Sequence, residues 1–294
     1  MINYETSLLF FEFSMQNIEF EEQIVHDILH SRFNNNYVTE EVMESKNIIA
    51  KIFDKICEFI DKAIMNARSI FSKINLKSSK DKMDKIRKST SEAKDVKFSL
   101  YVPKIELLQP SAIKDISPSA IGFDIDGAFS IKYDYNNQFY KKVMDNKRKG
   151  TSISKDEALK FVSKEIIGVE KDKVETVDDL LEKETIEIDK SNCRNNTGVV
   201  EKQLDEISKY MNGEFKSCIK ELTKLKNDAR KFAAATKLLK FNDTTGENVT
   251  AVIRAIASFY SKAVNYTVQY LFKSTSMYVS CVKKNVDNFE KALM

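Results

Sequence analysis

The fold of this chain is decided first by residues 48–74, which read IIAKIFDKICEFIDKAIMNARSIFSKI. Isoleucine, phenylalanine and alanine recur there at steps of three and four residues, and lysine, aspartate and glutamate fill many of the positions between. Such steps return to the same face of an α-helix. Thr39 is a suitable N-cap, with Glu40 and Glu41 in the first turn, where the helix dipole favours acids. The pattern predicts one amphipathic helix of about 35 residues, ending near Ile74.

A second long helix is predicted over residues 248–293, and its first half is apolar on most sides. Residues 249–272 contain only two charged side chains. A helix that is hydrophobic all round has to be buried, so we expect other helices to surround this one. A third predicted helix, at 199–239, and the helix at 48–74 offer one apolar stripe each. Two stripes leave an open side, so we expect a partner to cover part of it.

The apolar faces of the helices predicted at 48–74 and 248–293 are therefore the predicted sites of association. A partner there is a second copy of the chain or another protein, held by helix packing of the coiled-coil kind. The side chains expected to contact it are Ile52, Phe53, Ile56, Phe59, Val252, Ile256, Phe259 and Ala263.

The sequence pattern changes near Val96, where apolar and polar residues begin to alternate as in a half-buried strand. A second alternation runs from Ile121 to Tyr133, on both sides of residues 126–128. A three-residue loop at 126–128 would place all apolar side chains of a hairpin on one face. The pairs expected from this register are Ile125 with Phe129, Phe123 with Ile131 and Ile121 with Tyr133.

Together these patterns predict a mostly α protein, in which long amphipathic helices form a bundle with a small antiparallel β insert around residues 96–135. The 7 glycines and 3 prolines are too few for a fold with many tight turns. The regions expected along the chain are an N-terminal helical region at 1–95, a β insert at 96–150 and a C-terminal helical bundle region at 151–294. Shorter helices are expected at 5–32, at 154–167 before Gly168, and at 177–183.

Composition excludes several classes of function. The 294 residues carry a net charge of +3, from 40 lysines and 7 arginines against 44 acids. Specific nucleic-acid recognition relies on arginine, so we expect no specific nucleic-acid partner. The Lys-rich run at 77–97 contains interleaved acids and indicates a solvated helix or linker, although a nucleic-acid contact stays open there.

The four cysteines, at positions 57, 193, 218 and 281, form no C-x-x-C pair, so we expect reduced thiols and neither a metal nor another cofactor. The stretch from Met1 to Phe20 has no basic region before a long apolar run, so secretion by a signal peptide is not expected.

Two short motifs resemble catalytic ones. His26-Asp27-Ile28-Leu29-His30 is similar to the H-E-x-x-H of zinc metalloproteases, but Asp27 replaces the glutamate that acts as general base. Two histidines on the surface of a helix are the simpler interpretation. We therefore expect that the protein is not an enzyme. A metal-dependent hydrolase is kept as an alternative function.

The second motif, Asp124-Ile125-Asp126-Gly127, resembles the D-x-D-G core of haloacid-dehalogenase-type phosphatases. In that family the first Asp is the nucleophile and the second an acid/base at a strand end. Ala128 stands where the family has threonine, and no alternation of strands and helices follows. The hairpin explains the same residues with fewer assumptions.

Membrane binding is the other alternative. Residues 48–74 have the amphipathic pattern of an interfacial helix, and residues 255–272 approach the length of a membrane span. Lys262 lies within the second stretch, and a central lysine costs about 2.5–3.5 kcal/mol on insertion scales. A buried bundle helix is favoured, so membrane contact is possible but not preferred.

The N-terminal part carries a family resemblance. An acidic, aromatic start from Glu5 to Phe33 precedes Glu44-Ser45-Lys46 and the long helix at 48–74. This layout resembles structural proteins of the virions of large tailed bacteriophages, over about the first quarter of the chain. The resemblance implies a non-enzymatic structural or assembly protein, located in a virion assembled in the host cytoplasm, with copies of itself or other virion proteins as partners.

Overall fold

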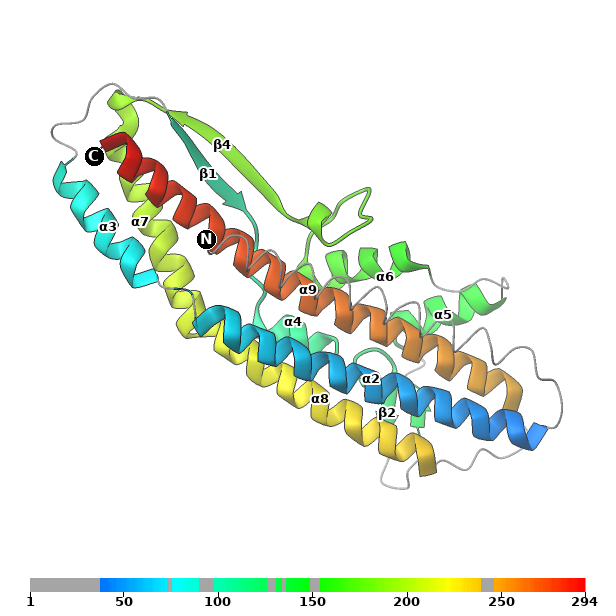
Figure 1. The fold of residues 1–294 in the computed structure, drawn as a ribbon. Coiled ribbons are helices and arrows are strands. Elements are labelled where there is room, and N and C mark those ends of the chain that lie inside the picture. The colour runs from blue at the N-terminus through cyan, green and yellow to red at the C-terminus, as the bar shows by residue number, and fades with distance from the viewer. Residues whose placement is uncertain are drawn as a thin grey trace.

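The described helices of the computed structural model form three columns that lie side by side (Figure 1). The residues that the structure describes are 38–72, 74, 76–89, 98–125, 131–133, 136–148, 154–238 and 246–293. The columns are α2 (Val38–Ser72) followed by α3 (Leu76–Ser89), α7 (Lys190–Asn212) followed by α8 (Glu214–Leu238), and α9 (Gly246–Leu293). The prediction of a mostly α bundle with a small antiparallel β component is confirmed.

Helix α9 spans the whole bundle without a break. Its 48 residues extend about 70 Å at 1.5 Å per residue. The column of α2 and α3 runs in the same direction as α9, and the column of α7 and α8 runs in the opposite direction (Figure 1). One continuous core includes residues from all three predicted regions, among them Phe53, Leu100 and Val282.

The apolar face of α2 packs against α8 and α9, and Phe53 lies at the centre of this contact. The Phe53 ring is stacked on Phe232 of α8, with 5.5 Å between the ring centroids. It also lies 5.6 Å from the ring of Tyr260 in α9 and 5.8 Å from that of Phe123. Aromatic pairs at such distances contribute about 0.5–1.5 kcal/mol beyond the area that they bury.

Two buried threonine hydroxyl groups on α9 donate to the backbone of their own helix. Thr267 donates to the carbonyl of Ala263 at 2.8 Å, and Thr275 donates to the carbonyl of Leu271 at 2.6 Å. Bonds of this kind allow small polar residues to face a core. The hydroxyl of Tyr260 is different, because it is buried and has no hydrogen-bond partner among the described residues.

A long antiparallel β ribbon lies along the C-terminal half of α9 (Figure 1). Strand β1 (Phe98–Lys104) pairs with β4 (Glu182–Ile188), so that Phe98 is opposite Ile188 and Lys104 is opposite Glu182. The predicted strand at β1 is confirmed. The helix predicted at 177–183 is wrong: a single 3₁₀ turn at Asp178–Leu180 leads directly into β4. Six of the seven β4 residues are exposed, so an alternating apolar pattern could not reveal this strand.

Side-chain amides of α9 hold the other edge of β1. Asn285 accepts a hydrogen bond from the backbone N–H of Tyr101 at 2.8 Å and donates to its carbonyl at 2.7 Å. Asn288 donates to the carbonyl of Ser99 at 2.7 Å. These amides take the place of a third strand. They satisfy edge groups of β1 that would otherwise be left without a partner.

The predicted hairpin is confirmed as β2 (Phe123–Ile125) and β3 (Ile131–Tyr133), but its register differs. Phe123 is opposite Tyr133 and Ile125 is opposite Ile131, so the connection comprises residues 126–130. The predicted three-residue loop and its pairs are wrong by two positions. A slip of two positions keeps every side chain on the same face, so the apolar pattern could not exclude it.

Three short helices pack against the long helices of the columns. They are α4 (Pro110–Asp115), α5 (Gln138–Arg148) and α6 (Lys155–Phe161), and the last continues as a π-helical turn over Val162–Ile167. The predicted start at Ser154 is confirmed by a capping box with Glu157, and the predicted end by Gly168 at φ 82°. The helix predicted at 5–32 lies outside the described residues.

The role of Asn285 can be tested by substitution. Asn285→Ala removes both bonds to Tyr101 and leaves a partly buried backbone donor and acceptor unpaired, so we expect the free energy of unfolding to fall by about 1–3 kcal/mol. The matched control is Asn227→Ala, which truncates an exposed asparagine of α8. Urea denaturation of both variants measures the difference. Equal stability of the two variants would show that the amide does not anchor the ribbon.

A second pair of substitutions tests the buried hydroxyls of α9. Tyr260→Phe removes a hydroxyl without a described partner, so stability should stay the same or rise by up to about 1 kcal/mol. Tyr270→Phe removes a hydroxyl that donates to the carbonyl of Glu106 at 2.8 Å, so stability should fall by about 0.5–1.5 kcal/mol. Thermal or urea unfolding compares them. A larger loss for Tyr260→Phe would mean that its hydroxyl is bonded after all.

Candidate functional site

The candidate site lies where both outer columns are interrupted. Helix α2 ends at Ser72 and α3 begins at Leu76, while α7 ends at Asn212 and α8 begins at Glu214. Residues from these four helix ends line one open groove of about 610 Å³. We call it the joint groove, and its lining residues are Ala67, Arg68, Ile74, Leu76, Lys77, Lys80, Ser208, Met211, Asn212, Phe215, Lys216 and Ile219.

Gly213 makes the interruption between α7 and α8. Its N–H donates to the carbonyl of Lys209 at 2.9 Å, and a Cβ atom at this position would stand 3.3 Å from the same oxygen. Both the N–H and the hydroxyl of Ser217 donate to the carbonyl of Gly213. Backbone hydrogen bonds therefore continue across Gly213, while α7 and α8 run at an angle to each other (Figure 1). The single helix predicted at 199–239 is wrong in this respect.

The floor of the joint groove is apolar and firmly supported. Phe215, only 5% exposed, lies with its ring 6.1 Å from that of Tyr210 and 6.3 Å from that of Phe272 in α9. Behind it, the hydroxyl of Tyr210 and the thiol of Cys218 both donate to the carbonyl of Leu108, at 3.0 and 3.4 Å. Burial raises the pKa of Tyr210, and that of Cys218 to about 12, so both remain protonated donors at neutral pH.

The rim of the joint groove carries charge of one sign. Its four charged lining residues are Arg68, Lys77, Lys80 and Lys216, and no acid lines the groove in the described part of the chain. Lys80 forms an ion pair with Asp205 at 2.9 Å, and this bond lowers the pKa of that carboxyl group. The other three have exposed side chains that form no ion pair or side-chain hydrogen bond with another described residue. The rim therefore attracts anions.

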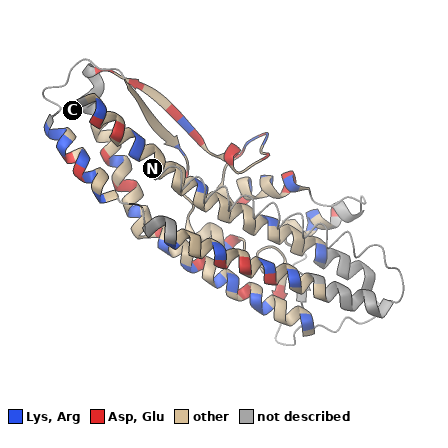
Figure 2. Cartoon of the chain, in the orientation of Figure 1, with Lys and Arg blue, Asp and Glu red and all other residues tan. Residues whose placement is uncertain are grey.

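This imbalance contrasts with the rest of the surface, where Figure 2 shows both signs interleaved along the columns. Ion pairs there connect one column to the next. Lys226 contacts Asp61 at 2.6 Å and Lys237 contacts Asp54 at 3.1 Å, both between α8 and α2. Lys82 of α3 contacts Glu290 of α9 at 2.6 Å.

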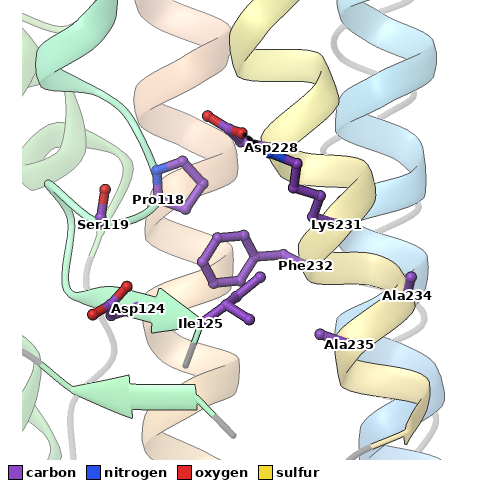
Figure 3. Close-up of a pocket in the computed structure, with 9 residues that line it drawn as sticks. All are labelled: Pro118, Ser119, Asp124, Ile125, Asp228, Lys231, Phe232, Ala234 and Ala235. Carbon is purple, nitrogen blue, oxygen red and sulfur yellow. Dashed lines mark hydrogen bonds and ion pairs between the residues drawn. The ribbon is translucent and has the colours of Figure 1, made fainter. Parts of the chain in front are cut away.

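A second pocket, of about 550 Å³, lies between the β2 hairpin and α8 (Figure 3). Asp124 of the phosphatase-like motif lines it, together with an ion pair of Asp228 with Lys231 at 3.2 Å. Figure 3 shows Pro118 and the Phe232 ring between Asp124 and that pair. The charged groups of this pocket thus lie apart and do not converge on one point.

The structure places the two catalytic-like motifs as follows. Asp124 lies on β2 of a two-stranded antiparallel sheet, whereas the phosphatase resemblance requires a parallel sheet, which the described residues do not form. Asp126, His26 and His30 lie outside the described residues. Within the described part, no three His, Cys, Asp or Glu side chains are grouped so that they could hold a metal ion.

The side chains predicted to contact a partner are placed differently from expectation. Ile52, Phe53, Ile56, Phe59, Ile256, Phe259 and Ala263 are each at most 8% exposed within the single chain, and the side chain of Val252 lies outside the description. Phe259, on the face of α9 where we expected a partner, is covered within the chain. Phe259 stacks on Phe139 of α5 at 4.7 Å and lies 5.4 Å from Phe161 of α6. Helix α5 escaped prediction because most of its residues are polar.

The membrane alternative meets the same difficulty. The apolar face of α2 is buried against α8 and α9, so in this fold it is not available to a lipid surface. Across the described helices, none combines the length and hydropathy that crossing a bilayer requires. The prediction of a buried bundle helix at 255–272 is confirmed.

The joint groove was missed at the sequence level. The available signals were two interruptions of the helical pattern, the polar residues after Phe71 and Gly213, each followed by lysines. Nothing in the sequence places these two interruptions side by side.

Comparison with known proteins finds no match to this chain among family models, curated proteins or solved structures.

The burial of Ile256 gives a direct test of its role. Because Ile256 is 0% exposed within one chain, Ile256→Asp should unfold the chain or lower its stability by more than about 3 kcal/mol. Met65→Asp is the control, since Met65 of α2 is 61% exposed and should change stability by no more than about 0.5 kcal/mol. Circular dichroism melts report both. A folded Ile256→Asp variant that only loses association would restore the partner-facing interpretation.

Proposed function

We propose that this protein is a non-enzymatic structural protein that acts by associating with copies of itself or with neighbouring proteins. The joint groove carries this proposal. It combines an apolar floor with an unbalanced basic rim on the flank of the bundle. Apolar surface that is open and rimmed by polar groups is typical of a protein interface, and a single sign of charge selects the partner and its orientation.

The shape of the bundle supports the same function. Helix α9 runs unbroken past both interruptions, and ion pairs join the columns on their outer faces. Such a bundle holds its two ends at a fixed separation of about 70 Å, the length of α9. A spacer or a structural subunit requires this property. A groove on the flank of this block leaves the rest of each molecule free for further contacts.

A virion is the setting that we propose for this assembly. The support is the resemblance of the N-terminal part to structural proteins of tailed-phage virions, which assemble many copies of non-enzymatic components. Mass spectrometry of purified particles from the virus that encodes the chain tests this setting. If capsid and tail proteins are detected in the particles but this protein is not, the proposed setting is wrong.

Self-association is the measurable consequence. In sedimentation velocity, the full-length chain should show a mass above that of one chain, and this mass should rise reversibly with protein concentration. Raising salt from about 0.1 M to about 1 M shortens the Debye length from about 10 to about 3 Å, so contacts guided by the rim charges should weaken. A monomer at every concentration and salt, folded and stable, would contradict the proposal of self-assembly.

A further inference from the structure

The joint groove has the chemistry to receive a segment that is acidic and rich in large apolar side chains. Its floor accepts apolar groups, and its lining includes four cations and no acid within the described residues. The side chains of three of these cations, Arg68, Lys77 and Lys216, are exposed and form no ion pair or side-chain hydrogen bond with another described residue. An occupant with carboxylates on either side of an apolar anchor would satisfy both features.

The chain itself contains such a segment, outside the residues that the structure describes. Residues 5–33 read ETSLLFFEFSMQNIEFEEQIVHDILHSRF and contain six acids, one arginine and five phenylalanines. Three of the acids, Glu19, Glu21 and Glu22, surround Phe20. This is the reverse of the charge on the groove rim, with an aromatic side chain at its centre.

We propose that the acidic segment 5–33 of one copy binds the joint groove of a second copy, with Phe20 on the apolar floor and its flanking glutamates at the basic rim. This inference rests on the proposed function, because it names the contact through which copies associate. The groove volume of about 610 Å³ admits a few large side chains, so the part around Phe20 is the anchor and the rest of the segment lies outside the groove.

The distance along α2 favours a second copy over the same chain. Helix α2 begins at Val38 and runs without a break to Ala67, where the lining of the groove begins. That separation is about 44 Å at 1.5 Å per residue. To reach its own groove, Phe20 would need the chain between it and Val38 to cover most of the roughly 60 Å that this stretch spans when fully extended. A neighbouring copy imposes no such demand.

A contact between a segment and a groove on different copies is heterologous. Each molecule that donates its segment still offers its own groove, and each occupied molecule still offers its own segment. Such contacts form rings when the rotation closes and open filaments when it does not. The proposed contact therefore accounts for growth beyond a dimer from a single kind of interface.

Charge exchange in the full-length chain tests the contact. The groove variant is Lys77→Glu with Lys216→Glu, and the segment variant is Glu19→Lys with Glu22→Lys. Glutamates in the first turns of α3 and α8 suit the dipoles of these helices, so the groove variant should fold, as circular dichroism can verify. A matched control, Lys51→Glu with Lys173→Glu, makes the same change of charge at exposed lysines that do not line the groove.

Each exchanged variant alone should self-associate at least tenfold more weakly than the wild type in sedimentation velocity, whereas the control should resemble the wild type. An equimolar mixture of the groove and segment variants should associate again. The unchanged acidic segment of the groove variant meets the unchanged basic groove of the segment variant, and the acidic groove of the first meets the basic segment of the second. Only a contact between copies predicts this rescue.

Other outcomes overturn the inference in distinguishable ways. If the wild type associates and the groove variant does so equally well, the groove is not the interface, while the proposed function stands. If both variants are weakened but their mixture is not rescued, the segment does not bind the groove of a second copy. If the wild type stays monomeric but binds phosphatidylglycerol vesicles, and the groove variant does not, the groove takes an anionic lipid surface. A monomeric wild type without vesicle binding refutes the proposed function and the inference together.

Discussion

The burial of α9 is the constraint on which the rest of the structure depends. A helix with apolar groups on nearly every side can be stable in water only when other elements surround it. Here α2 packs along its first half, with α8 packed mainly against α2, while α5 and α6 close the side at Phe259, and α3, α7 and β1 cover its second half. Each of these elements buries only part of the surface of α9, and together they enclose the helix. The removal of any of them would expose part of the same core.

The joint groove follows from this arrangement. The outer columns must follow α9 over its whole length, but each is made of two helices, and their ends meet at one level. Helix ends pack less completely than helix flanks, since the chain has to turn there. Phe215, Met211 and Leu76 thus remain at the base of an opening, and the lysines of the first turns of α3 and α8 stand around it. Where ion pairs join the columns, acids balance the cations, but at the groove the acids are missing from the described lining. We take this imbalance as the mark of a binding surface, and the acidic N-terminal segment of the chain has the opposite character.

Prediction succeeded where one helix or turn carries its own signal. The amphipathic helix at 48–74, the apolar helix that became α9 and the short helix from Ser154 to Gly168 were all read from periodicity and caps. The hairpin was found with the correct faces but a register shifted by two positions, because its alternating pattern is the same in both registers. The burial of Phe259 within one chain was not foreseen, since Phe139 and Phe161, which cover it, lie in stretches too polar to suggest core packing.

The sequence by itself determined where the long amphipathic and apolar helices lie, which face of the amphipathic one is apolar, and that α9 has to be enclosed, because these properties depend on residues close together in the chain. Only the tertiary structure decided what encloses α9, which strand pairs with β1, and that two interruptions far apart in the sequence, after Ser72 and at Gly213, form one groove. Strand pairing uses backbone groups that every residue carries, and β4 shows almost no apolar pattern. The cover of a helix and the meeting of helix ends depend on the summed shape of many side chains, so they have no local signal that a linear pattern could show.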